Sequence, residues 1–268
     1  MTTKTTLPHA NARKTPNEFL WADLSSTDDA AAAKFYSRVF GWAWQEMPLG
    51  ETMVHRDAQL GGHLIAGLDP VMPGSGQPTA WTNFVAVTDI DKTVAAVKHL
   101  GGSVAMPPMD VMGAGHMAVL MDPAGAAFGL WQPGTHTGAD AVNQPGTSTW
   151  FELATDDVAG ARKFYSELFG WEWDRIEGSD MEYWTAKLNG APAFAGLMAK
   201  PAEMGEMPNF WAAYFGVADV DAAAGEIQAA GGTVVAGPMR MGPGKGVCVL
   251  DPQGGYFVAY QMDEWPVA

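Results

Sequence analysis

The chain has 268 residues, of which 47% are hydrophobic and 17% are charged. This length favours two domains, and the composition is that of a globular chain rather than a disordered one. The single cysteine, Cys248, excludes an internal disulfide, and 30 acidic residues against 15 basic ones give a net charge of −15. Nucleic acids and anionic membranes carry charge of the same sign, so neither is an expected partner.

The N-terminal segment, residues 1–16, is polar. It lacks the apolar stretch of a signal peptide, and no apolar run in the chain approaches the ~20 residues that a membrane helix needs. We therefore expect residues 1–16 to be a flexible tail and the protein to be cytoplasmic.

The first predicted element is a strand at residues 19–24, a short run of apolar and aromatic residues. The sequence Ser25-Ser26-Thr27-Asp28 predicts the start of a helix, and Gly41 predicts its end. Three more strands are expected near residues 42–44, 52–54 and 64–66. Together these elements make one β-α-β-β-β unit.

A second unit of the same kind follows. It begins with a strand at residues 81–87 and continues with a helix capped by Asp89 or Asp91, which ends at Gly101. Further strands are expected at Val104 and at residues 117–121 and 127–131.

This pair of units occurs twice in the chain. Phe35-Tyr36 recurs as Phe164-Tyr165, and Phe40-Gly41-Trp42 recurs as Phe169-Gly170-Trp171, both at an offset of 129 residues. Residues 133–148, rich in glycine, proline and threonine, are interpreted as a linker. The sequence thus predicts module 1 at residues 17–132 and module 2 at residues 149–264.

These motifs, with Asp122-Pro123 and its copy Asp251-Pro252, resemble the vicinal oxygen chelate superfamily of glyoxalase I, bleomycin-resistance proteins and extradiol dioxygenases. The tandem form is similar to the subgroup labelled glyoxalase-like antigen or hydroxylase. The resemblance implies an α+β fold in which four β-α-β-β-β units form two tandem modules with curved mixed sheets. In this family, paired units form a cup with the active site on its concave face.

The resemblance also implies where metal ligands would stand. Metal-dependent members carry histidine, glutamine or glutamate at these positions, which here hold Trp21, Asn83 and Gly129 in module 1 and Trp150, Ala213 and Val258 in module 2. Only the asparagine is a ligand type, and a weak one. No metal cofactor is therefore expected.

The histidines leave one metal alternative. All six precede residue 137, so module 2 has none and a histidine-based site cannot occur twice. The alternative is one divalent metal ion in module 1, held by His55, His63 and a carboxylate.

Alternation along the first strand of each module places a tryptophan and a carboxylate on one face. These are Trp21 with Asp23 in module 1 and Trp150 with Glu152 in module 2. Burial raises the pKa of a carboxylate, which suits it to act as a general base or to bind a hydroxyl-bearing or cationic ligand. We predict Glu152 and Asp23 as the catalytic candidates. In the structural alternative, both bond neighbouring backbone or lie at a solvated rim.

The predicted ligand-binding residues are mostly aromatic and are expected to line the two cups. Aromatic walls with few polar groups are typical of a small-molecule pocket, although ordinary cores also contain them. The predicted set is Trp21, Trp81, Asn83, Trp131, Trp150, Trp211, Tyr256 and Tyr260.

Two functions fit these residues. The first is binding of a small hydrophobic, aromatic or carbonyl compound in the aromatic-lined cups, without a catalytic metal. The alternative is a glyoxalase-like or hydroxylase-type enzyme that uses Glu152 or Asp23 as a carboxylate base, or a single metal site in module 1. The expected partner is a small-molecule ligand, and a homodimer is left open.

Overall fold

The structure, a computed structural model, describes residues 15–49, 53–72, 74–177, 181–205 and 207–265. The expected tail lies outside these residues except for Thr15 and Pro16. Within the described residues, no helix is long and apolar enough to cross a membrane.

Module 1 contains eight strands in one mixed sheet. The strands are β1 (Phe19–Ser26), β2 (Ala43–Leu49), β3 (Met53–Leu60), β4 (His63–Pro70), β5 (Ala80–Ala86), β6 (Ser103–Asp110), β7 (Gly115–Met121) and β8 (Ala127–Pro133). Their order in the sheet is β2-β3-β4-β1-β5-β8-β7-β6. The central strands β1 and β5 are antiparallel, and each pairs in parallel with the last strand of its own unit.

Module 2 repeats this arrangement. Its strands are β9 (Ser148–Thr155), β10 (Glu172–Arg175), β11 (Tyr183–Lys187), β12 (Ala195–Ala199), β13 (Phe210–Gly216), β14 (Thr233–Met241), β15 (Gly244–Leu250) and β16 (Tyr256–Met262). The order β10-β11-β12-β9-β13-β16-β15-β14 matches that of module 1 strand by strand. The predicted α+β fold of two tandem modules with curved mixed sheets is confirmed.

Each unit contributes one helix after its first strand. The helices are α1 (Asp29–Phe40), α2 (Ile90–His99), α3 (Val158–Phe169) and α4 (Val220–Ala229), and a short 3-10 turn, η1 (Ala202–Met204), follows β12. The Asp28 carboxylate accepts a hydrogen bond from the Ala31 amide, and Gly41 ends α1 with φ 72°. Asp89 caps α2 in the same way. Both helix boundaries follow the local signals in the sequence.

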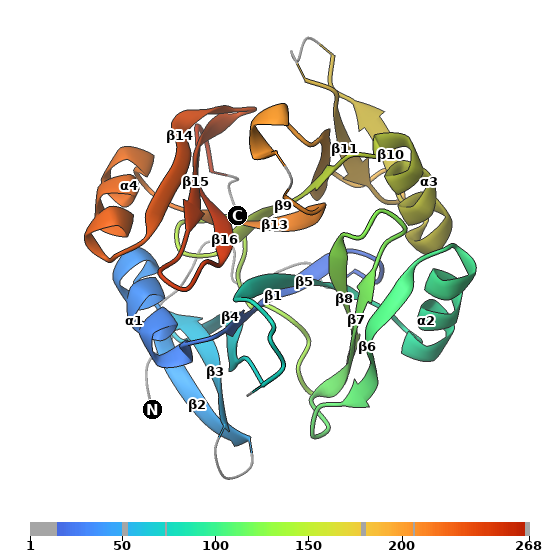
Figure 1. The fold of residues 1–268 in the computed structure, drawn as a ribbon, viewed down its shortest axis with the longest axis horizontal. Coiled ribbons are helices and arrows are strands. Elements are labelled where there is room, and N and C mark those ends of the chain that lie inside the picture. Colours follow the sequence, from blue (N-terminus) through green and yellow to red (C-terminus); the bar gives the residue numbers. More distant parts are fainter. Residues whose placement is uncertain (1–14, 50–52, 73, 178–180, 206, 266–268) are drawn as a thin grey trace.

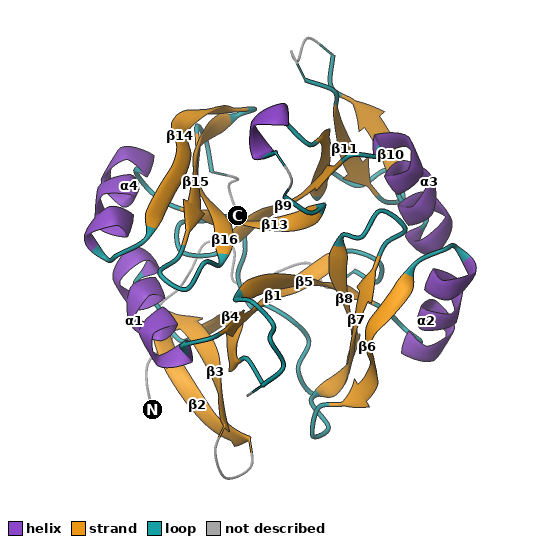
Figure 2. Cartoon of the chain, in the orientation of Figure 1, coloured by secondary structure: helices purple, strands orange, loops and turns teal. Residues whose placement is uncertain are grey.

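The two sheets lie back to back. Their convex faces meet at the centre of the molecule, and their concave faces open in opposite directions (Figure 1). Helices α1 and α4 lie together on one side of this junction, and α2 and α3 lie together on the other (Figure 2). Phe19 of module 1 packs on Phe151 and Trp211 of module 2, with ring centroids 4.5 and 4.9 Å apart. The main hydrophobic core is therefore shared between the modules.

Buried polar contacts also join the modules. The Tyr36 hydroxyl donates to Asp251 of module 2 at 2.9 Å and accepts from the Trp81 indole at 3.0 Å. The second copy mirrors this, with Tyr165 bonded to Asp122 at 3.1 Å and to Trp211 at 2.8 Å. The Phe-Tyr and Asp-Pro motifs that identify the repeat thus meet each other across the module junction.

Candidate functional site

The concave face of module 1, which we call cup 1, has an aromatic floor. Trp21 on β1, Phe84 on β5 and Trp131 on β8 belong to one buried cluster, separate from the shared core. Trp21 lies opposite Phe84 in the strand register, and its indole donates to the Asp23 carboxylate at 3.3 Å. Cup 1 thus brings together three of the predicted residues, Trp21, Asp23 and Trp131.

The linker lies against this floor. The His136 ring contacts Trp21, with centroids 4.5 Å apart, and the His136 carbonyl accepts from the Trp131 indole at 3.0 Å. Further along, the Ala139 amide donates to the Leu20 carbonyl at 3.0 Å. Residues 136–140 of the linker therefore form part of cup 1, while the linker as a whole connects the modules.

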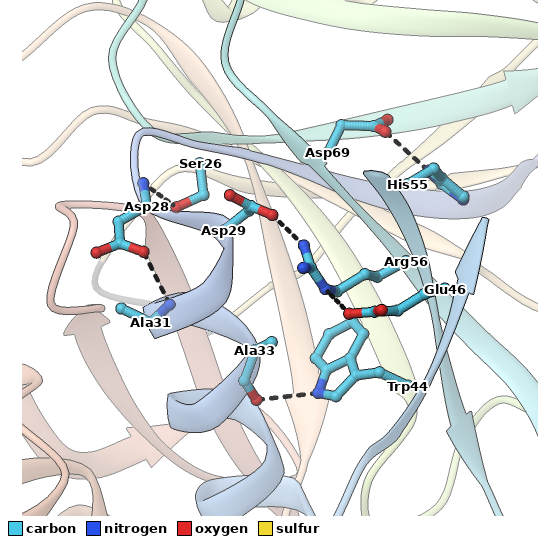
Figure 3. A network of polar contacts seen from close by, with 10 residues as sticks. All are labelled: Ser26, Asp28, Asp29, Ala31, Ala33, Trp44, Glu46, His55, Arg56 and Asp69. Carbon is cyan, nitrogen blue, oxygen red and sulfur yellow. Dashed lines mark hydrogen bonds and ion pairs between the residues drawn. The ribbon is translucent and has the colours of Figure 1, made fainter. Parts of the chain in front are cut away.

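One wall of cup 1 is acidic. Asp23 and Asp57 both lie opposite Gly67 in the register of β1, β3 and β4. Because Gly67 has no Cβ, the Asp23 carboxylate and the His55 ring lie close over its backbone. His55 Nδ1 is 2.8 Å from Asp69 Oδ1 (Figure 3). His55 Nε2 is 3.3 Å from Asp57 Oδ1. We call Asp23, Asp57 and Asp69, which surround His55, the acidic wall.

The acidic wall changes the protonation of His55 and of Asp23. Burial disfavours charge on His55, but the hydrogen bonds to Asp57 and Asp69 outweigh it and raise the pKa of His55 to about 11. Burial and the charge of Asp69 raise the pKa of Asp23 to about 8. At neutral pH, His55 is therefore an imidazolium and Asp23 holds its proton most of the time. An acid with such a pKa can exchange a proton with a bound ligand near neutral pH.

Arg56 does not neutralise the acidic wall. It follows His55 on β3, so its side chain points to the other face of the sheet. There it pairs with Asp29, and its Nε donates to Glu46 at 3.0 Å (Figure 3). Cup 1 therefore keeps its acidic character.

The concave face of module 2, which we call cup 2, is centred on Glu152. Tyr183 donates to one Glu152 oxygen at 2.7 Å and Tyr214 donates to the other at 2.5 Å. The Trp150 indole donates to the Tyr183 hydroxyl at 3.1 Å. Burial raises the pKa of Glu152, although both phenol hydrogen bonds favour the charged form. The predicted pair Trp150 and Glu152 is thus joined through Tyr183, without a backbone partner for the carboxylate in this network.

Two further predicted residues belong to cup 2. Tyr260 packs on Tyr214 with centroids 5.8 Å apart, and its hydroxyl donates to the Met241 carbonyl at 2.8 Å. Tyr256 packs on Phe210 at 5.1 Å. Trp150, Tyr256 and Phe210 all pack against the same buried cluster as Tyr260. Cup 2 is therefore lined by phenols and an indole around one carboxylate.

Trp81, Asn83 and Trp211 lie outside the cups. In the register of β5 with β1, Trp81 is opposite Leu24 and Asn83 is opposite Ala22, and cross-strand partners share a face. Leu24 and Ala22 face the shared core, so Trp81 and Asn83 do too. The buried Asn83 amide donates to the Trp211 carbonyl at 3.1 Å, across the module junction. Trp81 and Trp211 bond the buried tyrosines of the shared core.

Several cup residues were not in the predicted set. They are Asp57 and Asp69 of the acidic wall, and Phe84, Tyr183 and Tyr214. His55, which lies between those aspartates, was expected only in the metal alternative. Pairing β5 with β1 in the sequence would have found Phe84 opposite Trp21. The same pairing in module 2 places Tyr214 opposite Trp150. The sequence did not show that the side chains of His55 and Tyr183 face the cups, because the facing of a middle strand depends on its neighbours.

The metal positions implied by the family do not fit this chain. Of those positions only Asn83 is a ligand type, and its amide points into the module junction. In the described part of the chain, a different group could hold an ion: ligand atoms of Asp23, His55 and Asp69 lie within 4.8 Å of one another. His63, the other histidine of the expected metal alternative, is not a member of this group.

The comparisons with known proteins agree with this architecture. The model of the Glyoxalase/Bleomycin resistance protein/Dioxygenase superfamily matches residues 18–130 and 147–260. "Putative glyoxylase CFP32" of Mycobacterium tuberculosis is 40% identical over 247 residues, which is 91% of this chain and 93% of the relative. "Anthracycline biosynthesis protein DnrV" of Streptomyces peucetius is 34% identical over 272 residues, 96% of this chain and 98% of the relative.

A solved structure shows the same fold. The Mn(II)-bound glyoxalase from Novosphingobium aromaticivorans superposes with a TM-score of 0.64 at 16% identity, covering 93% of this chain and 83% of that one. Fold, repeat and sequence similarity therefore agree: the chain belongs to the glyoxalase/bleomycin resistance protein/dioxygenase superfamily.

Proposed function

We propose that the two cups bind a small aromatic or carbonyl compound, with Glu152 in cup 2 and Asp23 in cup 1 as its polar anchors. One observation carries the proposal. On the central strand of each sheet, a carboxylate lies two residues after an indole, and the indole is linked to it directly in cup 1 and through Tyr183 in cup 2.

The chemistry of this arrangement suits such a ligand. Trp150 and Tyr256 in cup 2 are half-buried and offer ring surface to a flat molecule, while Trp21, Phe84 and Trp131 form a buried aromatic floor in cup 1. A ligand hydroxyl or enol can donate to Glu152 in addition to the two phenols, because each Glu152 oxygen has further acceptor capacity. The names of the relatives, a glyoxylase and an anthracycline biosynthesis protein, support a carbonyl-bearing or polycyclic aromatic compound.

Binding of a neutral probe tests the proposal. A dihydroxyanthraquinone titrated into the full chain should quench tryptophan fluorescence at saturable stoichiometry. Glu152→Gln should weaken binding to cup 2 roughly tenfold, because the loss of one charge-assisted hydrogen bond costs about 1.5 kcal/mol or more. The exposed Glu167 on α3 provides the matched control, Glu167→Gln, which should bind as the parent protein does. No saturable binding of aromatic or carbonyl probes would remove the proposal.

The second candidate is an enzyme with one divalent metal ion in cup 1. It is favoured by the Asp23, His55 and Asp69 group, since one imidazole and two carboxylates form a donor set that suits Mn²⁺ or Zn²⁺. An ion would have to displace the imidazolium proton of His55. Titration with Mn²⁺ alone tests it: one ion per chain, lost in Asp69→Asn and retained in Glu152→Gln, is the expected result for this candidate.

A further inference from the structure

We infer that cup 1 selects an aromatic ligand that carries an amine cation, whereas cup 2 takes a neutral one. The inference rests on the proposed function and names the ligand class of one of its two sites. It is carried by the different chemistry of the two arms of the cup 1 sheet.

The first arm, formed by β2, β3 and β4, carries the acidic wall. Asp23, Asp57 and Asp69 face the cup, and the cation among them is His55, whose two nitrogens are taken by Asp57 and Asp69. The side chain of Asp69 remains 35% exposed, so it stays reachable from the cup. Even with Asp23 protonated, the two aspartates that flank His55 outnumber this one cation, which favours a further positively charged group beside the wall.

Basic side chains are absent from the rest of the cup as described. Among the strand residues of module 1, Arg56 is the only lysine or arginine, and it bonds Asp29 and Glu46 on the other face. The remaining described lysines and arginines of this module lie on helices α1 and α2, outside the cup. An anionic ligand would therefore find no lysine or arginine partner there.

The second arm, formed by β6 and β7, is rich in methionine. Met117 packs against the cluster of Trp21, Phe84 and Trp131, and Met109 lies opposite Met117 in the register, so both face the cup. Met109 is 48% exposed. Methionine side chains are flexible and polarisable, and they adapt to flat apolar ligands. The cup therefore pairs an apolar arm with an acidic one across an aromatic floor.

Cup 2 lacks this acidic arm. The strand register places Thr185 opposite Gly196, as Asp57 lies opposite Gly67. By the same register, Tyr183 takes the place of His55, and Met198 takes the place of Asp69. Of the acidic wall, only the carboxylate of the first strand is kept, as Glu152. Preference for a cation should therefore belong to cup 1 alone.

A matched pair of probes tests the inference. Both are anthraquinones with a two-carbon side chain, which ends in a primary amine in one probe and in a hydroxyl in the other. Their dissociation constants are measured on the full chain at pH 7 by calorimetry, with EDTA present so that no metal ion competes. The amine should bind cup 1 at least about tenfold more tightly than the alcohol, because an ammonium group can pair with the part-exposed Asp69 carboxylate and the alcohol cannot.

Two variants locate the preference. Asp69→Asn should bring the affinity for the amine down to that for the alcohol, while Asp91→Asn, at an exposed residue of α2, should leave both unchanged. Met47 lies opposite His55 in the register and is 36% exposed, so Met47→Lys adds a cation at the acidic wall without disturbing the core. This substitution should abolish the preference for the amine, and Met47→Gln should retain it.

The outcomes are distinct. Equal binding of the two probes overturns this inference and leaves the proposed function standing. A preference for the amine that survives both Asp69→Asn and Met47→Lys also overturns it, because the cation is then recognised elsewhere. Failure of both probes to bind overturns the proposed function together with the inference. Loss of the preference in Asp69→Asn and Met47→Lys, with the alcohol still bound, supports it.

Discussion

Tyr183 occupies in cup 2 the position that His55 occupies in cup 1. Each lies two residues before the residue opposite a central glycine, Gly196 or Gly67, so the equivalence follows from strand register. The histidine is a cation between carboxylates, whereas the tyrosine is a neutral donor to one carboxylate. Two copies of one module therefore carry different polar chemistry on the same frame.

The buried carboxylate of cup 2 should make stability depend on pH. The folded-state pKa of Glu152 is raised above its ordinary value of 4.5, chiefly by burial, so the folded chain binds this proton more tightly than the unfolded chain. The contribution of Glu152 to the free energy of unfolding is therefore most favourable below about pH 4.5, and it is lost as pH rises toward the folded-state pKa. The free energy of unfolding of Glu152→Gln should therefore rise relative to that of the parent protein as pH increases from 4 to 8. Urea unfolding across this range measures this difference, with Glu167→Gln, at an exposed residue of α3, as the control.

Removing the hydroxyl of Tyr36 or Tyr165 should destabilise the whole chain. Each hydroxyl bonds a buried aspartate of the opposite module, Asp251 or Asp122, and accepts from a buried indole. Tyr36→Phe and Tyr165→Phe should each lower the free energy of unfolding by about 1–3 kcal/mol, because buried polar atoms lose a partner. Denaturant unfolding should show one shifted transition. Two separate transitions would show that the modules unfold independently.

Adding a methyl group at a central glycine should perturb one cup at a time. A Cβ at Gly67 would occupy the place of the Asp23 carboxylate, and one at Gly196 would meet the Tyr183 hydroxyl and the Trp150 indole. Gly67→Ala and Gly196→Ala should each cost about 1–3 kcal/mol of stability through overpacking and weaken probe binding in their own cup. A Cβ at Gly225 on α4 meets nothing within 4 Å. Gly225→Ala should therefore stabilise the helix by roughly 0.5–1 kcal/mol and leave binding unchanged.

Asn83 should matter for packing and not for binding. Its amide bonds the Trp211 carbonyl, its own carbonyl oxygen has no hydrogen-bond partner, and module 2 carries Ala213 at this place. Asn83→Ala should change stability by less than about 1.5 kcal/mol, because the lost hydrogen bond is offset by removal of the unpaired oxygen. Asn83→Asp should cost about 3 kcal/mol or more, since it buries a charge without a cationic partner. A large loss of probe affinity in Asn83→Ala would place Asn83 in the binding site after all.

The features that could be predicted from the sequence are those that depend on residues close together in the chain. Asp28 and Gly41 delimit α1 through contacts within one helical turn, and the Phe-Tyr and Asp-Pro motifs identify the repeat. The pairing of Trp21 with Asp23 and of Trp150 with Glu152 followed from strand alternation alone. These parts of the structure need no knowledge of which strands are adjacent.

Features that depend on distant segments could not be predicted. Trp81 was expected in a cup, but its face is set by the pairing of β5 with β1, and it bonds Tyr36 in the shared core. Phe19 departs from simple alternation because the register shifts between Phe19 and Trp21, which turns Phe19 toward Phe151. The acidic wall combines residues from three strands, so no local pattern revealed it.

Because residues 136–140 of the linker lie in cup 1, the duplicated stretch of sequence, residues 17–132, does not contain all of the interior of module 1. A fragment that ends at Gln132 would lose His136 from above Trp21 and Ala139 from beside Leu20. It would also expose the convex face on which Phe19 meets Phe151. Each copy completes the interior of the other, so one copy taken alone would leave its half of the shared core open to water.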